Sequence, residues 1–158
     1  MPSWFKIVSL YTSLVRPLLE YASGAWDPHT VKNINSLEMV QRRAARFVKR
    51  DYRRTTSASS LIDGLGWSTL SDRRKSSRLC SFYKAYNKLS PISLHHLAKP
   101  SRSTRSTADG SCFFTLSSRT NVFKFSFFPR TIVDWNALSS DQRLKSTVDS
   151  FRNGLHSQ

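Results

Sequence analysis

The sequence has few acidic residues. Among its 158 residues, 10 are Asp or Glu and 25 are Lys or Arg, which gives a net charge of +15. So large a positive excess on a short chain repels itself unless an anionic partner is close. Nucleic acid is a better candidate than a membrane surface for this anionic partner, because apolar and basic residues are not sorted onto one long interfacial helix. We therefore expect RNA or DNA backbone as the partner, and no membrane.

The few acids are also scattered along the chain. Metal-dependent polymerases and nucleases hold divalent cations with carboxylates gathered at one site. Here no two acids are adjacent: Glu20, Asp27, Asp63 and Asp72 stand near expected turns, and Asp51 lies inside a basic run. We interpret them as caps and ion-pair partners. Because P-loop and nucleophile-elbow motifs are absent as well, the sequence predicts no catalytic residue, no metal site and no cofactor.

Cysteines and long apolar runs are equally scarce. Cys80 and Cys112 have no second Cys or His at metal-ligand spacing, which predicts two buried free thiols. His95 and His96 are adjacent, so on a helix they point about 100° apart and cannot share a metal. No run approaches the ~18 apolar residues of a membrane span. The start lacks a basic leader before an apolar stretch, so we expect an intracellular protein, nuclear or cytoplasmic.

Three amphipathic stretches predict long helices in the first part of the chain. The first covers residues 4–22, where Pro17 should kink it or start a second helix near Arg16. The second follows a cap at Asp27-Pro28, and the third begins at Thr69 or Ser71. The expected apolar stripe of the second helix is Ile34, Leu37, Val40, Ala44, Phe47 and Val48.

The composition changes in the last third. Residues 99–112 are rich in Ser, Thr and Arg without apolar periodicity, which predicts a linker. Phe123, Phe125 and Phe127 alternate with polar residues, which predicts a strand or hairpin, and a helix through Trp135 should follow. The expected fold class is therefore mainly α. A helical bundle at 1–98 precedes the linker, and a small Phe-rich α+β subdomain occupies 113–158.

Basic residues are densest between Arg42 and Arg54, where seven Lys or Arg accompany one acid. A solvated helix face usually mixes charges of both signs, whereas this one does not. Neutralisation of phosphates is the functional interpretation, and a merely solvated face is the alternative. The candidate nucleic-acid-binding residues are Arg42, Arg43, Arg46, Lys49, Arg50, Arg53, Arg54, Arg73 and Arg74.

Three tryptophans, Trp26, Trp67 and Trp135, adjoin turn signals. An aromatic ring beside a basic groove can stack on bases of a single strand. Core packing is the favoured interpretation, because each Trp adjoins an apolar stripe and carries a large burial energy.

Several motifs, in order along residues 10–155, carry a resemblance to a known family. They are Leu14-Val15-Arg16-Pro17-Leu18-Leu19-Glu20-Tyr21-Ala22, Trp26-Asp27-Pro28, Gln41-Arg42-Arg43-Ala44-Ala45-Arg46, Leu65-Gly66-Trp67, Phe127-Phe128-Pro129-Arg130-Thr131-Ile132 and Trp135-Asn136-x-Leu138. This series resembles the region after the catalytic palm in reverse transcriptases of non-LTR retrotransposons, closest to the CR1/jockey-like LINE group. Ser139 departs from it, since the family usually has Pro there.

The resemblance implies a thumb and the segment after it, which in such enzymes hold the primer-template duplex. The palm motif Tyr-x-Asp-Asp is absent, as are the fingers and the endonuclease. The chain would then be a fragment of an RNA-directed DNA polymerase from a transposable element, inactive alone because the catalytic carboxylates are missing. Its partners would be nucleic-acid backbone and the missing palm and fingers of the same polyprotein. The rival interpretation is a packing scaffold that docks on the palm without touching nucleic acid.

Overall fold

The computed structural model describes residues 3–99 and 110–155. Within these ranges the chain is mainly helical, as expected, and contains no strand. By its internal packing the chain divides into two compact units, Met1–Lys75 and Ser76–Gln158. Each unit is described here by itself.

The first unit begins with three helical segments in direct succession: α1 (Ser3–Leu10), the π-helical η1 (Tyr11–Val15) and α2 (Arg16–Glu20). Pro17 lacks the N–H that an α-helical bond to the preceding turn would need. The backbone widens to π geometry just before it, and the N–H of Arg16 donates to the carbonyl of Tyr11. The change of helical geometry predicted near Arg16 is therefore confirmed.

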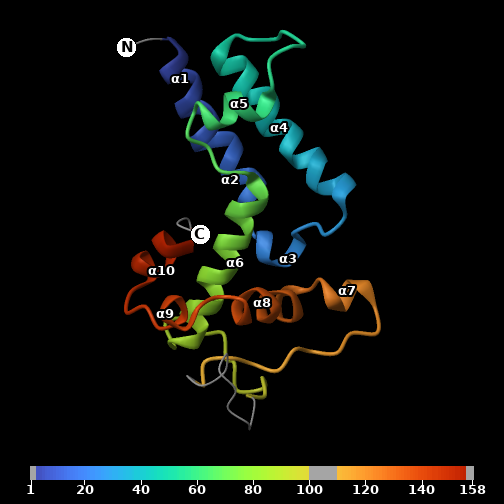
Figure 1. Cartoon of the computed structure of the whole chain (residues 1–158), viewed down its shortest axis with the longest axis vertical. Coiled ribbons are helices and arrows are strands. Elements are labelled where there is room, and N and C mark those ends of the chain that lie inside the picture. Colours follow the sequence, from blue (N-terminus) through green and yellow to red (C-terminus); the bar gives the residue numbers. More distant parts are fainter. Residues whose placement is uncertain (1–2, 100–109, 156–158) are drawn as a thin grey trace. The chain divides into compact units, whose positions relative to one another are not determined.

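The chain then passes through α3 (Ser23–Trp26) and returns alongside α1 as α4 (Val31–Lys49), shown in Figure 1. The cap of α4 is Thr30, whose hydroxyl accepts from the N–H of Asn33, and not Asp27-Pro28 as predicted. Arg50, in the left-handed region at φ 51°, ends the helix. Two further helices follow, α5 (Ala58–Asp63) and α6 (Leu70–Tyr86).

The buried face of α4 agrees only in part with the predicted stripe. Of that stripe Val48 is buried, Ile34, Leu37, Val40 and Ala44 are half-buried, and Phe47 is exposed. The other buried residues are Glu38, Gln41 and Ala45. Gln41 accepts from the hydroxyl of Tyr11 at 3.2 Å and donates to the carbonyl of Ser68 at 2.8 Å. A buried polar group is stable when it is hydrogen-bonded. These two partners therefore allow the side of α4 that carries Gln41 to face the interior of the first unit.

Glu38 joins α4 to the start of α6. Its carboxylate accepts from the backbone N–H groups of Ser71 at 2.8 Å and Leu70 at 3.3 Å. The first N–H groups of a helix have no partner within the helix, so an acid from a neighbouring element can cap them. Thr69 and Asp72 complete the turn, since the Thr69 hydroxyl accepts from the Asp72 N–H and donates to its carboxylate.

The second unit contains the C-terminal part of α6 and four short helices: α7 (Asn121–Lys124), α8 (Phe127–Asn136), α9 (Ser140–Arg143) and α10 (Val148–Leu155). Figure 1 shows α8, α9 and α10 gathered beside α6. Its core consists of Leu79, Cys80, Phe82, Tyr83, Leu97, Phe113, Ile132, Trp135, Leu138 and Phe151.

The strand or hairpin expected around Phe123, Phe125 and Phe127 is wrong, because this stretch forms α7 and the start of α8. Thr120 accepts from the N–H of Phe123 and caps α7, and Pro129 fits the first turn of α8. Alternation over so few residues fits either a strand or two short helices, and here the local capping favours the helices.

The division between the units also differs from the predicted linker. Residues 100–109 of that linker lie outside the described residues, whereas Ser111, Cys112 and Phe113 beside them are buried. The division falls within α6 because Phe82 packs against Phe113 and Trp135, with ring centroids 5.5 and 5.1 Å apart. The third predicted helix therefore contributes to both units.

Candidate nucleic-acid interface

The seven basic residues between Arg42 and Arg54 lie on the outer side of α4 and on the loop that follows it. Arg42 and Arg46 are half-buried, and the other five are exposed. The structure divides the set by what each side chain contacts. The exposed members are Arg43, Lys49, Arg50, Arg53 and Arg54.

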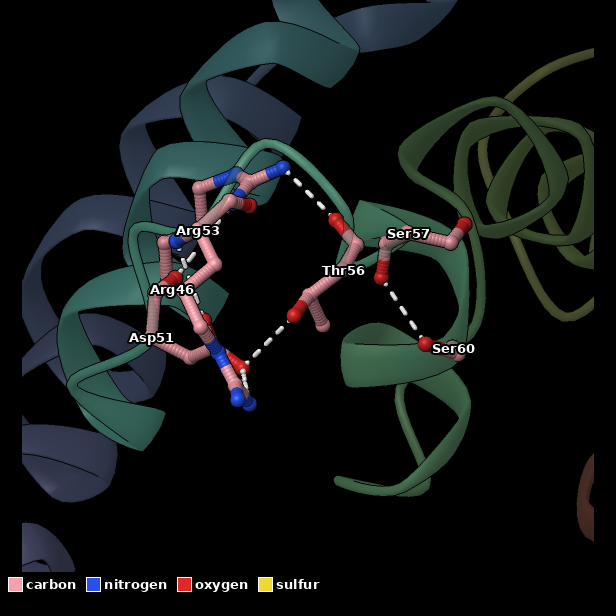
Figure 2. A network of polar contacts seen from close by, with 6 residues as sticks. All are labelled: Arg46, Asp51, Arg53, Thr56, Ser57 and Ser60. Carbon is pink, nitrogen blue, oxygen red and sulfur yellow. Dashed lines mark hydrogen bonds and ion pairs between the residues drawn. The ribbon is translucent and has the colours of Figure 1, made fainter.

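Arg46 holds the loop after α4. Its guanidinium donates to the carbonyl groups of Asp51 at 3.3 Å, Arg53 at 3.1 Å and Thr56 at 3.0 Å, as Figure 2 shows. A planar guanidinium carries five N–H donors in a fixed geometry, so one side chain can organise several carbonyl groups. The Arg46 donors are therefore used within the fold.

Asp51 holds the same loop from its other side (Figure 2). Its carboxylate accepts from Arg53 Nε at 3.1 Å, from Arg53 Nη2 at 2.9 Å, from the Arg53 backbone N–H at 3.1 Å and from the Thr56 hydroxyl at 2.9 Å. These bonds, that of the Arg53 side chain above all, hold the pKa of Asp51 well below its usual range. The same pair raises the pKa of Arg53. Although Arg53 is 77% exposed, its charge is compensated.

The lowered pKa of Asp51 predicts how this loop responds to acid. A carboxylate with a depressed pKa stabilises the fold above its unfolded value of about 3.9 and loses that contribution only as the pH falls through the lower folded value. We expect the Arg53 amide resonance, followed by NMR from pH 7 downward, to titrate with a midpoint below 3.9. The Asp51→Asn variant should abolish this titration. A midpoint near that of an ordinary Asp would mean that the carboxylate is not held by the loop.

Arg73 and Arg74, in the first turns of α6, were predicted to bind nucleic acid, but in the structure each forms an ion pair within the first unit. Arg73 forms a two-bond ion pair with Glu20, and this hydrogen bonding raises the pKa of Arg73. The side chain of Arg74 is 0% exposed, and its Nε donates to Asp27 at 2.7 Å. A buried guanidinium cannot reach a phosphate in solution. Both residues hold the first unit together.

The three tryptophans are engaged by the fold. Trp135 is fully buried in the second unit. Trp67 is half-buried and stacks on Tyr11 at 4.7 Å, with the guanidinium of Arg16 5.1 Å from its ring centre. Trp26 is partly exposed, but its indole N–H donates to the carbonyl of Tyr21 at 2.6 Å. The guanidinium of Arg74 also lies 6.0 Å from the ring centre of Trp26. For Trp135 the core interpretation is confirmed, and the other two rings contact cationic side chains of the first unit.

Sequence reasoning missed two exposed aromatic residues, Phe47 and Tyr52. The apolar spacing of the second helix places Phe47 in its predicted buried stripe. The available signal was the density of arginines on both sides of each residue, which marks a solvent-facing stretch.

A pocket of about 290 Å³ opens in the first unit, between α4, α5 and the start of α6. Arg42 lines it together with Glu38 and Asp63, and Trp67 forms part of its wall. Its charges therefore include both signs, and the Glu38 carboxylate already caps α6. This arrangement offers no excess of positive charge for a phosphate.

Other kinds of site would involve a metal ion, a reactive cysteine or a membrane-spanning helix. Residues 3–99 and 110–155 contain no group of three or more His, Cys, Asp or Glu placed to hold a metal ion. Cys80 and Cys112 are both buried, no disulfide joins them, and burial raises the pKa of Cys80. No helix in the described ranges has the length and apolarity needed to cross a bilayer. Compared with protein families, curated proteins and solved structures, the chain matches none.

Proposed function

We propose that this chain binds nucleic-acid backbone without sequence preference, as the primer-template-binding segment of a retrotransposon reverse transcriptase that lacks its palm. One observation carries the proposal. Four exposed cations on and just after α4 have no carboxylate partner among the residues that the structure describes. We call this set the basic surface: Arg43, Lys49, Arg50 and Arg54.

The environment of the basic surface favours a phosphate partner over simple solvation. The acid within this stretch, Asp51, is already paired with Arg53, so it does not compensate the four cations. Lys49 makes one long bond of 3.5 Å to the carbonyl of Gly64, and its ammonium keeps further donors. Uncompensated cations that face solvent bind phosphates through charge and counterion release.

The resemblance to reverse transcriptases supplies the rest of the proposal. The chain would work inside the cell, in the nucleus or the cytoplasm, beside the palm and fingers encoded by the same element. Alone it would add no nucleotides, because the palm carries the metal-binding carboxylates. The revised set of binding residues omits five of the nine predicted ones. The donors of Arg46, Arg73 and Arg74 are used within the first unit. Arg53 is paired with Asp51, and Arg42 is half-buried beside Glu38 and Asp63.

The salt dependence of binding tests this function. The full chain is titrated against a fluorescent duplex at several salt concentrations, beside a variant with Arg43, Arg50 and Arg54 changed to Gln. Each phosphate contact contributes about 0.9 to the slope of log affinity against log salt. We expect the slope to flatten by roughly two to three units, with similar losses on unrelated sequences because backbone contacts carry no base information.

A matched variant separates local contacts from net charge. Lys84, Arg119 and Lys145 are also exposed, and changing them to Gln removes the same charge from the second unit. This variant should keep nearly the original slope. Equal affinity and an unchanged slope in the Arg43, Arg50 and Arg54 variant would defeat the proposal.

A packing scaffold is the second candidate, and the first unit offers an observation in its favour. Leu10, Leu14 and Leu18 are all exposed, and their spacing of four places them along one side of the α1–η1–α2 segment. An exposed apolar row of this kind often marks a protein-binding surface. If docking on the palm were the sole function, neutralising the basic surface would leave nucleic-acid binding unchanged.

A further inference from the structure

Two large aromatic side chains are exposed near the end of α4. Phe47 is 56% exposed and Tyr52 is 65% exposed. Neither makes a ring contact or a side-chain hydrogen bond within the described residues. A single exposed ring is common on protein surfaces, so the significance of these two depends on what surrounds them.

Exposed cations stand on both sides of each ring. Arg43 lies four residues before Phe47 on the same side of α4, and Arg50 lies three residues after it. Arg54 follows Tyr52 by two residues. Cations and aromatic rings therefore alternate along this surface, whereas duplex backbone binding needs the cations alone.

The loop presents Tyr52 on a backbone that is held in place. Arg46 donates to the carbonyl groups of Asp51 and Arg53, the residues immediately before and after Tyr52. Asp51 in turn accepts from the Arg53 backbone N–H and from the Thr56 hydroxyl, as Figure 2 shows. A ring on an ordered backbone loses little further conformational freedom when it binds, which favours recognition.

We propose that Phe47 and Tyr52 stack on bases of an unpaired nucleic-acid strand while the basic surface contacts its phosphates. The inference rests on the proposed function and specifies which part of a primer-template this surface prefers, namely the unpaired strand. Every base has a π face, so stacking tolerates any sequence, but in a duplex these faces are covered by neighbouring bases. The surface should therefore bind an unpaired strand, ribose or deoxyribose, more tightly than a duplex of equal length.

The test uses the full chain with Phe47 and Tyr52 both changed to Ala. Its affinity for labelled oligouridylate and oligothymidylate is compared with that for an abasic strand and for a duplex at one salt concentration. We expect the variant to bind both unpaired strands at least about tenfold more weakly. Affinity for the abasic strand and the duplex should not change. The salt slope should also stay the same, because no charge is removed.

A matched variant carries Ala at Tyr21 and Phe123, which are also exposed aromatic residues but belong to other elements, the end of α2 and α7. It should bind all four ligands as the original chain does. Circular dichroism melting should show that every variant is folded, since each substituted ring is exposed.

The outcomes separate the two proposals. If the Phe47 and Tyr52 variant binds unpaired strands normally while neutralising the basic surface weakens binding, stacking is wrong and backbone binding stands. An equal loss on the abasic strand also overturns stacking, because no base is present there. If the original chain binds none of these nucleic acids, both proposals fail.

Discussion

Replacing Trp135 with Ala is expected to lower the free energy of unfolding by about 3–5 kcal/mol. The ring is 0% exposed, and its centroid lies 5.1 Å from that of Phe82 and 5.9 Å from that of Phe151. Its indole N–H donates to the buried carbonyl of Ser111 at 2.8 Å. The substitution therefore leaves a cavity in the core of the second unit and removes this hydrogen bond.

Urea denaturation followed by circular dichroism measures this effect. Val133→Ala serves as the control, because Val133 lies on the same helix but is exposed, and it should change the stability by no more than about 0.5 kcal/mol. Nucleic-acid binding by the folded fraction should be unaffected by either change. A Trp135→Ala chain that melts normally but no longer binds would show instead that this ring stacks on bases.

Replacing Asp27 with Ala should be similarly severe, with a loss of about 3–5 kcal/mol. Asp27 pairs with Arg74, whose side chain is 0% exposed, and the exposure of the Asp27 side chain is 8%. Removing the carboxylate takes this counter-charge away from a buried guanidinium, which carries a large desolvation penalty. The loss of stability would come from the buried Arg74 guanidinium without the Asp27 carboxylate.

A double-mutant cycle identifies that origin. When Arg74→Met accompanies Asp27→Ala, the buried guanidinium is removed together with its counter-charge, so the double variant should lose less stability than the sum of the two single variants. The free energies come from the same urea denaturation. Strictly additive losses would show that the two side chains do not stabilise each other.

Much of the helical content could be predicted because helix signals act within a few residues. The change at Pro17 follows from one missing N–H, and the third helix follows from the spacing of Leu79, Phe82 and Tyr83, which are all buried. The burial of Trp135 follows from the apolar stripe beside it, and the two buried free cysteines follow from the lack of a second Cys or His at metal-ligand spacing. The α7 segment escaped prediction because its phenylalanines fit either periodicity.

The sequence by itself determined a basic, mainly helical chain whose arginines concentrate around the end of one helix. Only the tertiary structure decided which of these arginines face solvent. Arg73 and Arg74 pair with acids 53 and 47 residues away, and Gln41 is buried because Tyr11, 30 residues away, bonds to it. Spacing along one element cannot reveal such partners, yet they determine whether a polar group can leave water. The same partners leave Arg43, Phe47, Arg50 and Tyr52 exposed at the end of α4.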